Sequence, residues 1–437
     1  MNNNNLTLRS LKTKINIENM FVLSLAISPL FLLTVTGWMT HIIAVCALLA
    51  FLVLSKNKIK GNELIAPEKF TFATKLLSLT FALPLIAILL SQAFRGQFSA
   101  PYYDSPAHIM LCIMILLAIL KTNPRVVELM SYCFPLVTLL ALGSILIHPN
   151  LHWGIDRLST QAVDPLELGS LSLTFALLSL FSIKLHNSNS RLLLLFKLIG
   201  FCAGVYLSIV SGSRTGWLAL PIVVFLWLYY DLKRFTLPTK TIVAIAITTV
   251  LISSYFLSSN VHQRIDNVSK DILSYKWNTD NPSDYTSVGA RISFARMAIF
   301  LLEQKPLSGW GDGGFKSVIN DPALKFSQIE TKTIALEAGF HNDITANMVR
   351  SGIWGLISTV ALFLVPAIFF ISNLRATHKA QRDVAFIALI FLICQFISSL
   401  SMEILNLRYS ASFFGLMLAV FCGQLLFFTA NSNSKTL

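Results

Sequence analysis

The feature that most constrains this chain is a succession of about twelve apolar stretches, most of them about 17 to 25 residues long, the length a helix needs to cross ~30 Å of hydrocarbon. Only 13% of the 437 residues are charged, whereas soluble domains carry about 25%. The predicted fold is therefore an all-α polytopic membrane protein. The predicted spans are 17–36, 38–55, 76–93, 107–120, 126–147, 166–184, 191–210, 215–230, 240–258, 350–372, 384–401 and 410–429.

The net charge of +13 is explained by the predicted topology. With a cytoplasmic N-terminus, the cytoplasmic tails, loops and their flanks carry twenty lysines and arginines, and the short outside loops carry four. This distribution agrees with the positive-inside rule. The excess of basic residues therefore gives no support to nucleic-acid binding. Membrane lipids are the expected neighbours of the protein.

One outside segment, 259–349, is much longer than the others, and it divides the chain into helices 1–9 (1–258), this loop, and helices 10–12 (350–437). Loops of this length are usually functional or disordered. The segment mixes both signs of charge with tryptophans and apolar runs. We therefore expect a small, partly helical cap on the membrane surface.

Within this loop, Val288, Ile292, Ala295, Ile299 and Leu302 recur at helical spacing, which predicts an amphipathic helix. Thr286 or Ser287 can cap its start, and Lys305-Pro306 ends it.

Arg291 lies in the first turn of this predicted helix, where the helix dipole normally disfavours a cation. A bound anion would remove this conflict, and an ion pair with Asp284 or simple exposure is the alternative. Arg296 lies on the other side of the apolar stripe, so one ligand is not expected to engage both arginines. Arg296 and Arg264 remain further candidates for substrate binding.

Arg214 is the only basic residue of a very short outside turn, Ser211–Gly216, between two spans. An arginine at a helix end often extends to lipid headgroups, and this remains an alternative. The small residues around Arg214 allow close backbone approach, which favours a phosphate or another anion at the membrane surface.

His341-Asn342-Asp343 closes the long loop just before the next helical region. Asn342 or Asp343 can cap that helix, and His341 is either part of the capping turn or the best general-base candidate in the outside loops. Glu403 and Arg408 are charges in an apolar neighbourhood, for which a mutual ion pair is favoured over a functional role.

No cofactor or catalytic metal is expected. The outside loops hold no Asp-x-Asp pair and no dense cluster of carboxylates and histidines at ligand spacing. The six cysteines lie in six different predicted spans, which argues against disulfides and a structural zinc site.

Three of these segments resemble motifs of the bacterial O-antigen ligase family, in the larger group that includes O-antigen polymerases. Arg214–Leu218 resembles its Arg-x3-Leu signature, and Ser287–Arg291 resembles the arginine-bearing start of a loop helix. His341-Asn342, nine further residues and then Gly352-Ile353-Trp354-Gly355 match the His-Asn-x9-Gly-x-x-Gly signature. Glu403 and Arg408 resemble an acidic residue and an arginine of some ligases more loosely.

The resemblance implies a GT-C-like fold in the bacterial inner membrane, with the site facing the periplasm. It implies an inverting, metal-independent glycosyltransferase that moves O-antigen from undecaprenyl diphosphate to lipid A-core during lipopolysaccharide biosynthesis. His341 would be the general base, and Arg214 and Arg291 would neutralise the diphosphate. Asn342, Arg296, Arg264, Glu403 and Arg408 would be further candidates for substrate binding.

Three alternatives remain open at this point. An O-antigen polymerase would use the same donor with another lipid-linked glycan as acceptor, and a protein O-oligosaccharyltransferase would glycosylate protein. A lipid-linked glycan transporter could also have about twelve spans. Few ionisable residues lie at mid-span, and the candidate site lies in an outside loop, which argues against transport.

Overall fold

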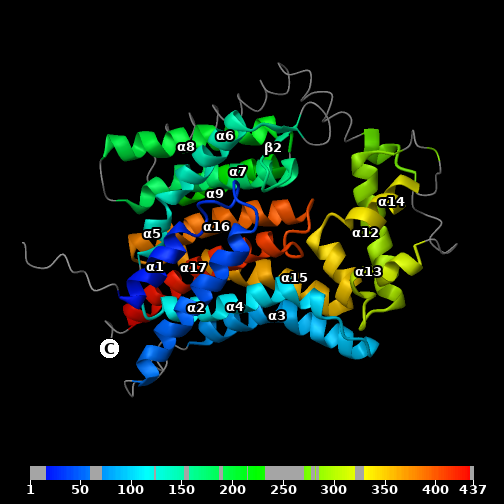
Figure 1. Ribbon diagram of the computed structural model, residues 1–437, viewed down its shortest axis with the longest axis horizontal. Coiled ribbons are helices and arrows are strands. Elements are labelled where there is room, and N and C mark those ends of the chain that lie inside the picture. Colours follow the sequence, from blue (N-terminus) through cyan, green and yellow to red (C-terminus); the bar gives the residue numbers. More distant parts are fainter. Residues whose placement is uncertain are drawn as a thin grey trace, which may run out of the picture.

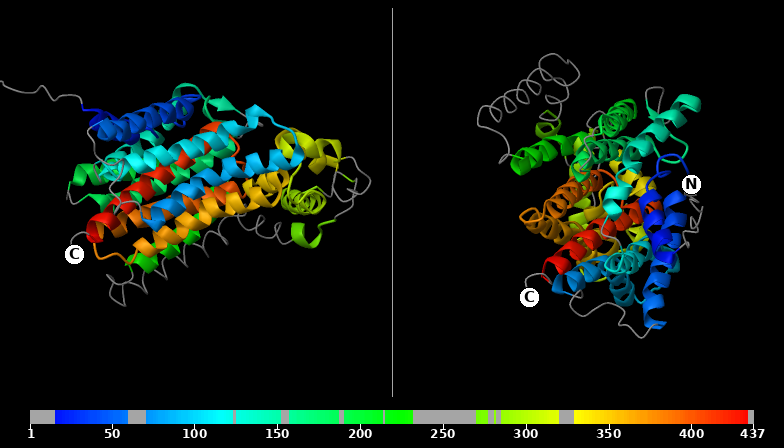
Figure 2. Two further views of the ribbon diagram at one scale, coloured as in Figure 1. Left: turned by 90° about the horizontal axis from the view of Figure 1, so that it is seen from below. Right: turned by 90° about the vertical axis from the view of Figure 1, so that its left-hand side faces the viewer.

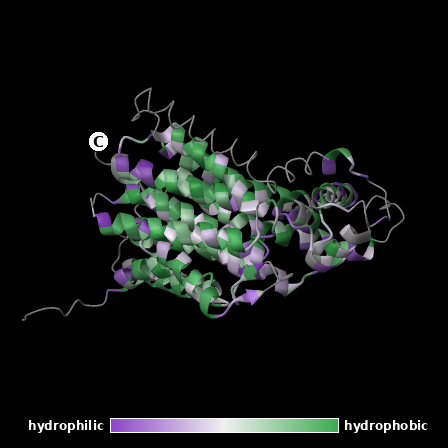
Figure 3. Cartoon of the chain, turned by 90° about the horizontal axis from the view of Figure 1, so that it is seen from above, coloured by the Kyte–Doolittle hydropathy of each residue, from purple (hydrophilic) through white to green (hydrophobic). Residues whose placement is uncertain are grey.

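The computed structural model describes residues 16–59, 71–122, 125–151, 157–186, 190–213, 215–231, 270–276, 281, 285–319 and 329–433. Long helices run side by side, and α12, α13 and α14 gather at one end of them, opposite the end of α17 (Figures 1 and 2). We call this group of three helices the cap. The hydropathy of the long helices is predominantly apolar, whereas the cap mixes polar and apolar residues (Figure 3).

The elements before the long loop are α1 Ile17–Ile27, α2 Trp38–Ile59, α3 Phe72–Arg95, η2 Ala100–Tyr103, α4 Asp104–Ile119, α5 Val126–Met130, α6 Cys133–Ile147, β1 Asn150–Leu151, β2 Leu158–Ser159, α7 Pro165–Phe181, η3 Ser182–Leu185, α8 Arg191–Val210, η4 Thr215–Leu218 and α9 Ala219–Asp231. The later elements are α12 Ser287–Gln304, α13 Gly311–Gly314, η6 Phe315–Ser317, α14 Ile329–Ala338, α15 Asp343–Asn373, α16 Lys379–Ser399 and α17 Arg408–Asn433.

Within the described residues, nine helical segments are long and apolar enough to cross a membrane. Two predicted spans correspond to shorter apolar helices, Ile17–Ile27 and Thr215–Tyr230. The first is shorter than predicted because the chain leaves the helix after Ile27 and turns until Gly37, which has a positive φ of 75°. The predicted span 240–258 lies outside the described residues.

Three helices form the centre of the bundle. The apolar windows of α7, α16 and α17 are 78 to 83% buried inside the protein, whereas that of α8 is 33% buried and those of α3 and α15 are 39% buried. The central helices meet through aromatic side chains, such as Phe175 of α7 and Phe391 of α16, which both contact Phe413 of α17. The less buried helices therefore present the apolar surface that a bilayer would cover.

The small sheet is a single antiparallel pair, in which Asn150 faces Ser159 and Leu151 faces Leu158. The chain then enters α7, whose start is capped by Asp164: its carboxylate accepts a hydrogen bond from the Glu167 N–H at 2.9 Å. Pro165 follows at the first helical position, where no N–H is required. These local features place Arg157 and Asp164 near the start of a central helix.

Candidate functional site

The turn between α14 and α15 presents His341. Gly339 and His341 both have a positive φ, of 81° and 48°, and His341 is the one non-glycine residue with a positive φ among the described residues. Asn342 then caps α15, since its Oδ1 accepts hydrogen bonds from the N–H groups of Ile344 at 2.8 Å and Thr345 at 3.3 Å. The left-handed conformation of His341 is uncommon outside glycine and costs free energy, so the surrounding contacts must hold it.

These contacts come from the loop between α16 and α17. Glu403 Oε1 accepts a hydrogen bond from the Phe340 N–H at 2.8 Å, and a Cβ on Gly339 would lie 2.3 Å from the same oxygen. Asp343, which is fully buried, accepts a hydrogen bond from the Leu405 N–H at 2.9 Å. The turn is thus fastened on both sides of His341 to one loop.

The surroundings of His341 favour a neutral imidazole. Burial lowers the pKa of His341 below the usual range of histidine, and the Arg291 guanidinium lowers it further. Glu403 and Asp164 act in the opposite direction, because their negative charges favour the protonated ring. The structure therefore brings His341 into the electrostatic reach of Arg291 and Glu403, and Asn342 lies beside it as the helix cap.

The helix that carries Arg291 has the predicted bounds. α12 spans Ser287–Gln304, and the Thr286 hydroxyl caps it by accepting a hydrogen bond from the Gly289 N–H at 3.0 Å. The predicted buried stripe was wrong: Ile299 is 52% exposed, and the buried face instead carries Ala290, Phe294, Met297, Ala298 and Leu301. This second stripe packs because Phe294 contacts Phe340 and the His341 ring, at centroid distances of 6.1 Å in both cases.

Arg291 and Arg296, the two arginines of the long loop that the structure describes, have different surroundings. Arg291 is exposed and acts on His341, whereas the Arg296 guanidinium lies over the ring of Tyr275, 5.8 Å from its centroid. The expectation that one ligand does not engage both arginines stays a prediction. Arg214, Arg264 and the alternative partner Asp284 lie outside the described residues.

Residues on both sides of position 214 pack on the start of α7. A Cβ on Gly169 would lie 2.3 Å from Ser211 Oγ and 2.5 Å from Ser213 Cβ, so only glycine permits this approach. On the far side, a Cβ on Gly216 would lie 3.4 Å from the Ser170 Cα. The chain on either side of Arg214 is therefore fixed against the helix whose capping residue, Asp164, acts electrostatically on His341.

Arg157 is a basic residue of this region to which sequence reasoning gave no role. A Cβ on Gly212 would lie 3.2 Å from Arg157 Cγ and 3.3 Å from its Nε, so the arginine side chain crosses the bare backbone of the turn two residues before Arg214. Arg157 makes no ion pair with any residue that the structure describes. Its position in an outside loop was visible in the sequence, but its contact with Gly212 required the fold.

The favoured ion pair between Glu403 and Arg408 was wrong. Arg408 instead pairs through its Nε with Asp104 at the start of α4. The two carboxylate oxygens of Glu403 accept hydrogen bonds from the Phe340 N–H and from the side-chain amide of Asn406, each at 2.8 Å. Glu403 therefore belongs to the His341 turn, whereas Arg408 joins the start of α17 to the start of α4.

The helix after the turn breaks at Gly352, nine residues into α15, with φ 63° and ψ −145°. The loop after α12 fills the break: the Ile353 N–H donates to the Pro306 carbonyl at 2.8 Å, and the Trp310 N–H donates to the Val349 carbonyl at 2.8 Å. A Cβ on Gly352 would lie 2.2 Å from the Pro306 oxygen. The long helix 343–373 thus begins seven residues before the predicted span at 350 and is bent where the cap joins it.

Two further observations bear on the chemistry. Among the described residues, no group of three or more histidine, cysteine or carboxylate side chains is arranged to hold a metal ion. The charges near the imidazole are one exposed cation, Arg291, and two carboxylates, Asp164 and Glu403. This arrangement provides a proton acceptor beside a cation, which suits the transfer of a group from an anionic leaving group to a hydroxyl.

The sequence profile of the O-antigen ligase family matches residues 198–360. This segment is similar to the O-antigen ligase family. A protein of Haemophilus influenzae described as uncharacterized is also similar: it is 24% identical over 392 residues, which cover 85% of this chain and 90% of the relative.

The matched segment begins within α8 and ends within α15, so it contains α12, His341 and the break at Gly352. Arg157, Asp164 and Glu403 lie outside the matched residues and approach the matched segment from α7 and the loop before α17. The described site is therefore assembled from the matched segment and from flanking parts of the chain.

Proposed function

We propose that this protein is an O-antigen ligase, which transfers O-antigen from undecaprenyl diphosphate to a sugar hydroxyl of lipid A-core. The observation that carries the proposal is His341: a histidine whose pKa is lowered by burial, held in a left-handed turn within the electrostatic reach of Arg291, in a segment that matches the O-antigen ligase family. A neutral imidazole can accept a proton, which an acceptor hydroxyl must lose as it attacks.

The proposed reaction is a single displacement. The acceptor oxygen forms a bond to the anomeric carbon while its proton passes to His341. The bond between the anomeric carbon and the diphosphate oxygen breaks, and the electron pair leaves with the diphosphate on its lipid carrier. Attack from the face opposite the leaving group inverts the anomeric configuration.

Arg291 and Arg214 are the proposed ligands of the diphosphate. A guanidinium binds phosphate oxygens through paired hydrogen bonds, and it stabilises the negative charge that develops as the leaving group departs. The electrostatic effect of Arg291 on His341 and the packing of Ser213 and Gly216, on either side of position 214, against α7 support this assignment. Asn342 contributes by capping α15 and so fixing the turn.

The proposed setting is the bacterial inner membrane, with twelve spans and with residues 259–349 as a periplasmic loop that includes the cap. The support is the nine candidate spans among the described residues, the gathering of α12, α13 and α14 at one end of the bundle, and the distribution of basic residues in the sequence. Both substrates are lipid-linked, so a site at the membrane boundary can bring them together by orientation.

The test is transfer by the purified protein in detergent, with undecaprenyl-diphosphate-linked O-antigen as donor and lipid A-core as acceptor. We expect product from the wild-type protein in the presence of a chelator and none above background from His341→Ala. Absence of transfer to lipid A-core, together with chain growth when a second lipid-linked repeat is supplied, would identify a polymerase instead.

A further inference from the structure

A polar cavity of about 240 Å³ lies beside the His341 turn, between the cap and the first turns of α15. Its lining includes Gly313 from α13, Lys316 from η6, Glu337 from α14, Arg350 from α15, and Glu403 and Asn406 from the loop before α17. We call it the cap cavity. Its volume lies below the range of about 300 to 1,000 Å³ that is typical of drug-sized ligands, so it suits a single small polar group.

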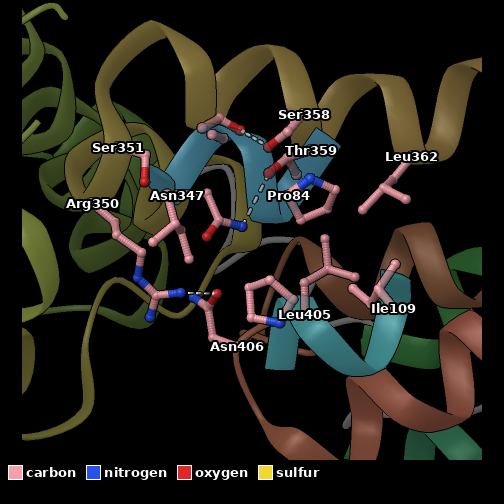
Figure 4. Close-up of a pocket in the computed structure, with 14 residues that line it drawn as sticks. Pro84, Ile109, Asn347, Arg350, Ser351, Ser358, Thr359, Leu362, Leu405 and Asn406 are labelled. Carbon is pink, nitrogen blue, oxygen red and sulfur yellow. Dashed lines mark hydrogen bonds between the residues drawn. The ribbon is translucent and has the colours of Figure 1, made fainter. Parts of the chain in front are cut away.

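The side chains at the base of the cap cavity are held in a fixed geometry. The Arg350 guanidinium donates to Asn406 Oδ1 at 2.7 Å, a bond that is visible in the close-up of an adjoining smaller pocket (Figure 4). Asn406 Nδ2 donates to Glu403 Oε2 at 2.8 Å, and Glu403 Oε1 accepts from the Phe340 N–H. Each carboxylate oxygen has a second lone pair, so Glu403 can accept a further hydrogen bond from a ligand.

The walls of the cap cavity allow close contact with a ring-shaped ligand. Gly311, Gly313 and Gly339 expose backbone instead of side chains, and the largely buried Phe315 offers an apolar surface. The two cationic and two acidic residues of the lining balance each other in formal charge. A neutral ligand rich in hydroxyl groups fits this combination better than a phosphate, which would require excess positive charge.

The cap cavity and Arg291 approach His341 from different elements. The cavity is joined to the turn by the bond from Phe340 to Glu403, whereas Arg291 acts on His341 from α12. In an inverting displacement, the acceptor lies beside the base and opposite the leaving group. This separation is compatible with a cavity that serves the acceptor and an arginine that serves the donor diphosphate.

We propose that the cap cavity binds one neutral sugar residue of the acceptor glycan, with Glu403 and Asn406 holding its hydroxyl groups. The proposal rests on the proposed function for the identity of the acceptor. It assigns acceptor recognition to a site that is distinct from the diphosphate ligands, so changes in the cavity should affect the two substrates differently.

Two leucines of the cap offer a matched test. Leu336 and Leu302 are both half-buried and pack against the same apolar cluster, but only Leu336 lines the cap cavity. We expect Leu336→Trp to raise the KM for lipid A-core about tenfold or more, with kcat and the donor KM changed less than about twofold, and Leu302→Trp to change neither KM. An unchanged acceptor KM would overturn the proposal, and a raised donor KM would assign the cavity to the donor.

A second variant and a binding measurement separate this proposal from the proposed function. Lys316 is exposed at the cavity, so Lys316→Trp can fill the opening without disturbing buried packing. Binding of delipidated core oligosaccharide to the purified protein is measured by calorimetry. Binding that is lost in both tryptophan variants supports the cavity even if the wild-type protein transfers nothing to lipid A-core. No binding to the wild type, or equal binding to the variants, overturns it.

Discussion

Glu403 Oε1 accepts a hydrogen bond from the Phe340 N–H at 2.8 Å, so a side chain from the loop between α16 and α17 fixes the residue directly before His341. Because Gly339 lacks a Cβ, the carboxylate can approach this turn closely. The proposed base therefore depends on a residue that lies 62 positions later in the chain and outside the segment that matches the O-antigen ligase family. Substitution of Glu403 should therefore change the pKa of His341, which can be measured.

The first prediction is that His341→Asn abolishes transfer and leaves the fold intact. Asparagine tolerates a positive φ better than most residues, so it should keep the turn at 48° while removing the proton acceptor. We expect kcat to fall by about 100-fold or more, the usual contribution of a general base. Thermal unfolding in detergent provides the control, and transfer at the wild-type rate would exclude His341 as the base.

The second prediction concerns the acid limb of the pH profile. Because burial lowers the pKa of His341, kcat/KM should stay high as pH falls until it passes through a pKa below that of free histidine. Glu403→Gln removes a charge that raises this pKa, so the limb should move to lower pH. Arg291→Gln removes a charge that lowers it, so the limb should move to higher pH.

The opposite signs of these two shifts are the diagnostic feature. The measurement is kcat/KM against pH for each variant, normalised to its own maximum, so that a general loss of activity does not affect the midpoint. Glutamine can still accept the Phe340 N–H, which preserves the turn. Midpoints that move together, or do not move, would show that a group other than His341 governs the acid limb.

Local signals in the sequence predicted α12 well. A capping hydroxyl at Thr286 and a proline after Lys305 define its bounds, and both are properties of the nearby residues. The buried face was not predictable in the same way, because two stripes of α12 have helical spacing and tertiary contacts decide between them. The choice depends on Phe294 meeting Phe340 and His341, which are more than forty residues away in sequence.

The hydrogen-bond and ion-pair partners of the charged residues could likewise not be predicted from the sequence. Glu403 and Arg408 are only five residues apart, and an ion pair between them was expected. Arg408 instead forms its ion pair with Asp104, on a helix 304 positions earlier. The break in α15 belongs to the same class: Gly352 was noted as part of a motif, yet the loop 305–310 that fills the break is distant in sequence. Hydropathy predicted nine spans that match candidate membrane-spanning helices among the described residues, because each span depends on its own composition.

The third prediction is that Arg157 contributes to donor binding. Its side chain lies across Gly212, beside the turn that carries Arg214, and it has no ion-pair partner among the described residues. We expect Arg157→Ala to raise the donor KM by roughly three- to tenfold, because the residue is partly exposed to solvent. Arg157→Lys should recover part of the loss.

The matched control for this prediction is Arg191→Ala. Arg191 is exposed at the opposite end of α8 from the Ser211–Ser213 turn, so its loss should leave both KM values unchanged. Inhibition by free undecaprenyl diphosphate gives an independent measurement, since it should weaken in parallel with the donor KM in Arg157→Ala. An increase in the acceptor KM alone would contradict a role at the diphosphate.

The fourth prediction is that Gly352→Ala destabilises the junction between the cap and the bundle. The residue has a positive φ of 63°, and a Cβ would collide with the Pro306 carbonyl that accepts from the Ile353 N–H. We expect a loss of about 1 to 3 kcal/mol from the backbone strain, seen as a lower midpoint of thermal unfolding in detergent. Transfer should fall as well, because Gly352 lies on the helix that Asn342 caps beside His341.

Gly143→Ala provides the comparison for this variant. Gly143 lies inside α6, and no atom lies within 4 Å of the position that its Cβ would occupy. Alanine is favoured over glycine in a helix by about 1 kcal/mol, so this substitution should leave the midpoint unchanged or raise it. If both variants unfold like the wild type, the break at Gly352 does not require glycine, and the fit of Pro306 into α15 tolerates a side chain.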